Sequence, residues 1–412
     1  MEKDLFKTRR WIQVALINFC IVALAGITMR YKINFALPIV NQKYLLYAHS
    51  NFAFAGWVTI VLMVLMINYL LQHNVAADYK KYNRILFAGC IAAYGMFVSF
   101  ICEGYGYFSI TFSTLSIVVS YFFIFFYWRD LNKADDKSYA PKWFKAALIL
   151  WFISTLGAFV LAWLMINFSK TQDYYFAALY FFLHFQYNGW FLFACFGLLF
   201  SYLYKKGFLP TVAINKKLFI IMAITVAPTY FLSILWLKLP KALYLVADIS
   251  GIFQLLVLFY FARLFPVLKK NIPHKVTKTT RYLWMMASVA FVLKIILQML
   301  SVVPYLSHFA FGFRPVVIGY LHLSFLGIIS LFILGYINEI AVPGKHHVTA
   351  GGTTLFVIGF LVQEIVLMLQ GLEAMEIEPL PFANLILFGS AILMGIGLIW
   401  ITVGIARPEK KE

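Results

Sequence analysis

The chain has 412 residues, of which 63% are hydrophobic and only 12% are charged, whereas soluble domains carry about 25% charged residues. A soluble enzyme, a nucleic-acid-binding protein and a disordered protein therefore do not fit, because each needs a more polar surface. The net charge of +18 does not form a patch for nucleic acid, because the Lys and Arg residues lie in short connections between apolar runs.

Twelve apolar runs are long enough to cross a hydrocarbon core of about 30 Å. They predict an all-α polytopic membrane protein with twelve transmembrane helices in three four-helix arcs. The predicted spans are 11–29, 45–71, 84–103, 107–128, 144–168, 174–204, 216–237, 241–263, 281–303, 315–338, 351–371 and 382–405. We expect a single transmembrane domain over 1–412, with pseudo-repeats at roughly 1–130, 140–265 and 280–405.

The basic residues are distributed unequally between the two sides of the predicted bundle. One side, which includes both termini, carries 26 of the 34 Lys and Arg residues, and the other side carries 7. Cytoplasmic connections are enriched in Lys and Arg. We therefore expect a multi-pass protein of a bacterial inner membrane with both termini in the cytoplasm. The remaining basic residue, Lys294, lies inside the ninth run.

Three of the eight histidines lie inside apolar runs, at matching places. His49, His184 and His322 fall in the outer halves of the second, sixth and tenth predicted spans. They are 135 and 138 residues apart, which is four helices in each case. Each is followed within two helical turns by a glycine, namely Gly56, Gly189 and Gly327.

An imidazole in hydrocarbon needs a partner. The three histidines could be hydrogen-bonded between helices, or they could be ligands, because neutral His is the commonest metal ligand and a standard axial ligand of haem iron. The glycines would allow a neighbouring helix or a flat macrocycle to approach the backbone closely.

Two segments carry a resemblance to a known family. AHSNFAFAGWVTI (48–60) and YLHLSFLGIISLFILGY (320–336) resemble the second and tenth helices of subunit I of the haem-copper oxidase superfamily. The resemblance covers the whole chain in topology and these helices in sequence. It implies a haem, of type b, held by His49 and His322, and it implies that His184 occupies the position of a copper ligand.

The chain departs from the oxidase pattern at the copper site. The seventh run has no histidine, and the tenth has His322-Leu323-Ser324 where the oxidases have two histidines. One imidazole does not hold copper tightly. We therefore expect no oxygen-reducing centre and no terminal-oxidase activity. In this respect the chain is more similar to the NnrS-type haem proteins linked to the nitric oxide response.

Three ionisable side chains fall at membrane depth: Asp248, Lys294 and Glu364. Such groups need a partner or a water-filled cavity. They could form a buried network, with Lys294 paired to Asp248 or Glu364, they could form a proton route, or Lys294 could face a haem propionate. Gln298 lies one turn from Lys294, and Gln254 adds hydrogen-bonding capacity nearby.

Two further residues lie where they could contact a haem. Arg314 precedes the tenth span, and Arg pairs well with carboxylates, so it could meet propionates or simply anchor the helix at the interface. Trp57 could stack on the macrocycle or pack between helices.

The sequence thus predicts a membrane haem protein in electron transfer or in the handling or sensing of a diatomic gas, NO or O2. If it is an enzyme, it is an oxidoreductase. Besides membrane lipid, we expect a redox partner or a respiratory subunit as its partner. We expect no binding of nucleic acid. The alternatives are a proton-coupled secondary transporter and a metal-free assembly or accessory subunit of a respiratory complex.

Overall fold

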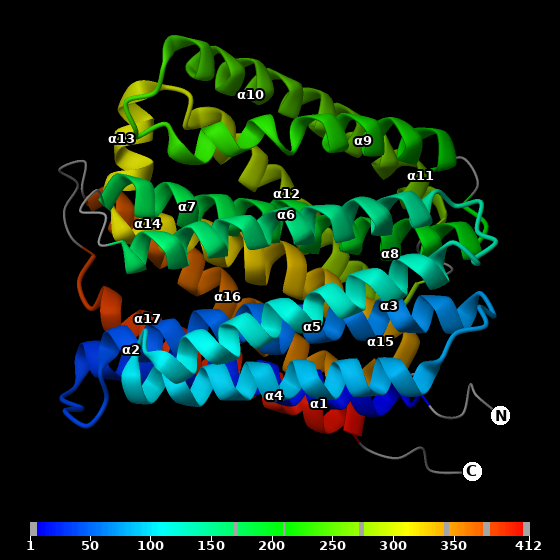
Figure 1. The fold of residues 1–412 in the computed structure, drawn as a ribbon, viewed down its shortest axis with the longest axis horizontal. Coiled ribbons are helices and arrows are strands. Elements are labelled where there is room, and N and C mark those ends of the chain that lie inside the picture. The colour runs from blue at the N-terminus through cyan, green and yellow to red at the C-terminus, as the bar shows by residue number, and fades with distance from the viewer. Residues whose placement is uncertain are drawn as a thin grey trace. The chain divides into compact units, whose positions relative to one another are not determined.

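The computed structural model of the protein describes residues 6–167, 172–208, 211–271, 276–341, 346–373 and 380–406. All regular structure in these residues is helical (Figure 1). The all-α prediction is therefore confirmed, as expected of segments that must satisfy their backbone polar groups internally in lipid. The chain divides into two compact units, Met1–Asp130 with Ile333–Glu412, and Leu131–Phe332.

The first unit combines the beginning and the end of the chain. Its helices are α1 (Thr8–Asn34), a long helix made of α2 (Gln42–Phe52), η2 (Ala53–Thr59) and α3 (Ile60–Gln72), then α4 (Tyr79–Glu103), α5 (Tyr107–Leu131), α15 (Leu331–Ala341), α16 (His346–Glu373) and α17 (Ala383–Ala406). α16 packs closely on α17, and α17 packs on α1. The side chain of Arg9 donates to the carbonyl of Ile405 at 3.1 Å, so the first and last helices are tied together.

The second unit holds the middle of the chain. Its helices are α6 (Ala140–Ile166), a long helix made of α7 (Gln172–His184), η3 (Phe185–Phe191) and α8 (Leu192–Lys205), then α9 (Thr211–Thr225), η4 (Pro228–Ile234), α10 (Lys241–Ala262), α11 (Leu264–Asn271), α12 (Lys278–Leu300), α13 (Pro304–Gly312), α14 (Arg314–His322) and η6 (Leu323–Ser330). α6 packs along the long helix, and α10 packs on α9, η4 and α12.

The number of spans differs from the predicted twelve. Ten helices in the described residues are long and apolar enough to cross a membrane, and α9 with η4 would make an eleventh. The helix from Gln172 to Lys205 exists but does not qualify, because Gln186, Tyr187 and Asn188 interrupt its apolar run. The predicted span 216–237 is broken by a bend of 54° between α9 and η4, where Pro228 lacks a backbone N–H. The protein is thus a multi-pass membrane protein with ten or eleven candidate spans.

Each of the first two predicted repeats contains a Trp–Asn hydrogen bond at the same spacing. Trp11 Nε1 donates to Asn83 Oδ1 at 2.8 Å in the first unit, and Trp143 Nε1 donates to Asn215 Oδ1 at 2.6 Å in the second. The two partners are 72 residues apart in both cases. The third predicted repeat is divided instead, because α12 and α14 belong to the second unit and α16 and α17 to the first.

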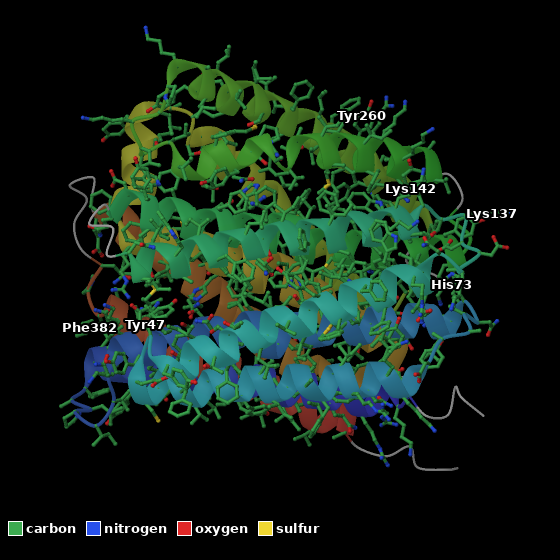
Figure 2. All side chains as sticks on the ribbon, viewed as in Figure 1. Tyr47, His73, Lys137, Lys142, Tyr260 and Phe382 are labelled. Atoms are coloured by element: carbon green, nitrogen blue, oxygen red, sulfur yellow. The ribbon has the colours of Figure 1, made fainter. Side chains whose placement is uncertain are left out.

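The side chains also distinguish the two ends of the first unit. Tyr47 and Phe382 lie at one end of it, and His73, which follows α3, lies at the other (Figure 2). The connections around residues 35–41 and 380–382 are therefore at the same end of this unit, as an up-and-down arrangement of these helices requires.

Candidate functional site

Each of the three histidines lies beside a π-helical segment. η3 and η6 begin directly after His184 and His322, and η2 begins four residues after His49. A π-helix is a rare single-turn insertion in an α-helix and occurs frequently at functional sites. The regular spacing of the histidines in the sequence therefore coincides with a repeated feature of the backbone.

The imidazole of His49 is held by a hydrogen bond to the backbone of α1. Its Nδ1 lies 3.0 Å from the carbonyl oxygen of Val22 on α1. A carbonyl only accepts, so Nδ1 carries the proton and Nε2 keeps a lone pair. The ring packs against Gly26, where an added Cβ would lie 3.3 Å from its Cε1 atom. Metal-ligating histidines commonly have this arrangement, in which the second nitrogen is anchored to a backbone carbonyl.

His184 is fully buried and has both ring nitrogens occupied. Nε2 donates to the carbonyl of Val226 at 2.7 Å, at the bend between α9 and η4. Nδ1 accepts from the side-chain amide of Asn188 at 3.1 Å. In this arrangement His184 joins the long helix to the bent one, which is the hydrogen-bonded alternative considered from the sequence.

His322 ends α14 and is half-buried in the second unit. Its backbone position matches that of His184, because a π-helix follows each directly. His49 belongs to the first unit and His322 to the second. Their joint binding of one iron remains a prediction.

The aromatic rings that follow two of the histidines stack on the preceding helix. Trp57 stacks on Phe19 with ring centroids 4.3 Å apart and planes 6° apart. Trp190 stacks on Trp151 at 4.3 Å and 5°. One face of Trp57 is thus covered by Phe19. An added Cβ on Gly189 would lie 2.8 Å from the Leu150 Cβ atom, so this glycine allows α6 to approach closely.

The ionisable residues predicted at membrane depth lie in different surroundings. Lys294 on α12 is 4% exposed, whereas Asp248 on α10 is exposed, and the described residues contain no ion pair between them. Glu364 on α16 is half-buried and lies in the first unit. Arg314 is exposed at the start of α14.

Lys294 lines a small polar cavity inside the second unit. The cavity has a volume of about 20 Å³. Polar side chains of η3, α9, η4 and α10 share its lining: Asn188, Thr225, Thr229 and Gln254. Gln254 was expected near the intramembrane charges. The two threonines were missed, because a threonine in an apolar helix usually bonds its own backbone and gives no signal of a site.

No group of three or more His, Cys, Asp or Glu side chains within the described ranges could hold a metal ion. A haem with two axial histidines would need only two protein ligands. No protein-family model matches the chain, and no curated protein matches it in sequence. The fold and the histidines define an α-helical multi-pass membrane protein with three histidines at π-helical segments.

Proposed function

We propose that the protein binds a haem within the membrane, with His49 and His322 as the axial ligands, and that it serves in electron transfer or in handling or sensing a diatomic gas. The observation that carries the proposal is the hydrogen bond of His49 Nδ1 to the Val22 carbonyl. This bond holds the ring in one orientation and leaves Nε2 as the atom that would bind iron.

Three further features of the described residues support the proposal. Gly26 removes a side chain beside the ring. The π-helix after each ligand changes the direction of the side chains along the helix, which is one use of such insertions at ligand sites. Arg314, exposed at the start of α14, is available to pair with a propionate. A bound haem of type b would supply reversible one-electron chemistry and, with a ligand displaced, gas binding.

A terminal oxidase is not proposed. His184 is the residue that would hold copper, and its two ring nitrogens are bound to Val226 and Asn188. The protein would then act as an oxidoreductase only by passing electrons through the haem to or from a redox partner or respiratory subunit.

The proposed orientation has both termini in the cytoplasm of a bacterial inner membrane. It is supported by the distribution of basic residues, 26 on one side and 7 on the other. The connections at residues 35–41 and 380–382, which lie at the same end of the first unit, would face outward (Figure 2).

The test is the haem content of the purified protein. We expect a reduced-minus-oxidised difference spectrum of haem b and about one haem per chain by pyridine haemochrome. His49→Ala and His322→Ala should each lose most of the haem, and His73→Ala, at the end of α3, is the matched control. Wild-type protein without haem, or haem content unchanged in both variants, would refute the proposal.

A second candidate is a proton-coupled transporter. It is favoured by the 54° bend between α9 and η4, since broken helices beside buried polar groups are typical of transport sites. Proton flux into proteoliposomes, measured with an internal pH dye and abolished by Asp248→Asn or Lys294→Leu, would support transport. Equal flux in wild-type and empty vesicles would exclude proton coupling.

A further inference from the structure

The cavity beside Lys294 is lined by polar side chains that are almost fully buried. Lys294 is 4% exposed, Asn188 6% and Gln254 8%, and the two lining threonines, Thr225 and Thr229, are 2% exposed each. These residues come from five segments of the second unit, namely η3, α9, η4, α10 and α12. They therefore form a built polar site that does not depend on the haem proposal.

The hydrogen bonds around the cavity leave a surplus of oxygen acceptors. Asn188 uses its amide nitrogen on His184, and its Oδ1 atom is buried without a partner. Thr225 donates to the Ile221 carbonyl at 2.8 Å, so its hydroxyl oxygen keeps a lone pair. Gln298 Oε1, one turn beyond Lys294, is also buried without a partner.

Lys294 is the group with protons to give, and no carboxylate lies against it. It forms no ion pair within the described part of the chain, and none of the residues that line the cavity is acidic. His184, the titratable group on the neighbouring helix, has both nitrogens occupied. An unpaired and unsolvated ammonium group is strongly disfavoured in such an interior.

Three kinds of occupant can be compared for the cavity beside Lys294: an anion, a metal cation and a water molecule. An anion would face the unpartnered oxygen of Asn188, and a cation would face the ammonium group, so each would meet repulsion. A water molecule both accepts from Lys294 and donates to Asn188. The volume of about 20 Å³ is sufficient, because a single water needs roughly 10–15 Å³.

We propose that this cavity binds one ordered water molecule, which accepts a hydrogen bond from Lys294 Nζ and donates one to Asn188 Oδ1. The site is thus a hydrated lysine at membrane depth. The second O–H group of the water can donate a hydrogen bond to the Thr225 hydroxyl oxygen or to the side-chain oxygen of Gln254.

Met222 on the cavity wall provides the test, since radiolysis of a bound water oxidises the side chains that it touches. Wild-type protein in detergent is exposed to short X-ray pulses and digested, and methionine oxidation is measured by mass spectrometry. We expect Met222 to be oxidised several-fold faster than Met66, which is 0% exposed in the first unit and away from the cavity. Equal rates would overturn the proposal.

Two variants and a control identify what holds the water. Asn188→Leu and Lys294→Leu should each bring Met222 oxidation down to the rate of Met66, whereas Lys217→Leu, at an exposed lysine of α9, should leave it unchanged. Rapid oxidation of Met222 in both folded variants would overturn the assignment. Loss of wild-type labelling on adding bromide would place an anion there and would also overturn it. The wild-type comparison decides the question even if a variant does not fold.

Discussion

The observed hydrogen bonds of His184 differ from the role that its position in the sequence implies. Its position in the sequence matched that of a copper ligand, but its ring joins the long helix to the bent one. The sequence could not reveal this role, because it depends on the Val226 carbonyl, which is available only where the helix bends before Pro228. His49 is predicted from the sequence to be a ligand. The sequence could not reveal the hydrogen bond from its Nδ1 atom to the Val22 carbonyl, which leaves the lone pair on Nε2.

Replacing His184 should therefore affect stability and leave haem binding intact. His184→Ala leaves the Asn188 amide nitrogen without its acceptor and removes one of the two side-chain hydrogen bonds to the Val226 carbonyl, which also accepts from Thr229 at 3.1 Å. A buried group left unpaired costs about 1–3 kcal/mol. We expect a lower midpoint of thermal unfolding in detergent with wild-type haem content by pyridine haemochrome. Loss of haem together with unchanged stability would show that His184 is a ligand after all.

A second residue-scale prediction uses the hydrogen bond shared by the two repeats. Asn215 is 1% exposed and joins Trp143 to the Ser138 carbonyl, whereas Asn83 is only half-buried. Asn215→Ala should thus lower the free energy of unfolding by about 1–3 kcal/mol, and Asn83→Ala by less. Denaturant titration of both variants gives the comparison, and an equal loss would contradict the role of burial.

At the scale of the helices, the sequence predicted positions well and local irregularities poorly. The span expected at 144–168 corresponds to α6, and the span expected at 382–405 corresponds to α17. The π-helical segments were not predicted, because a single inserted residue leaves the hydropathy of an apolar run unchanged. Averaging the hydropathy over a whole span also conceals the polar residues from Gln186 to Asn188. With these residues, the helix from Gln172 to Lys205 is not among the candidate spans.

Two glycines of α17 provide a matched test of helix packing. An added Cβ at Gly397 would lie 2.6 Å from the Gly352 carbonyl and from the Phe356 amide of α16, whereas at Gly389 it would meet nothing within 4 Å. Gly397→Ala should destabilise the protein by about 1–3 kcal/mol because the neighbouring backbone must move. Gly389→Ala should be neutral or stabilising by up to about 1 kcal/mol. Thermal unfolding of both variants checks the order, and a reversed order would contradict the α16–α17 packing.

At the scale of the whole molecule, membrane insertion and the helical class followed from the composition, and the division into units did not. The spacing of the histidines predicts three equal repeats. The compact units follow packing instead, since α1 finds its partner in α17 at the far end of the chain. Long-range pairings of this kind leave no periodic signal in hydropathy.

The orientation of the chain can be tested on either side of the bent pair. If α9 and η4 cross together, reporters inserted after Gly207 and after Lys238 should lie on opposite sides of the membrane. A fluorescent reporter should be active at one of the two positions, and a phosphatase that folds only outside the cytoplasm should be active at the other. The same reporter active at both positions would reduce the number of spans to ten.

The packing of α1 on α17 has a consequence for how the protein is made. The ribosome delivers α1 to α5 first and must then synthesise the whole second unit before α16 and α17 emerge. During that time the early helices are in the membrane without their final neighbours, so they are exposed to lipid, to insertion chaperones and to quality-control proteases. The second unit is continuous in sequence and can finish packing sooner. Packing is thus expected to be completed first in the middle of the chain, with closure of α17 onto α1 as the last step of assembly.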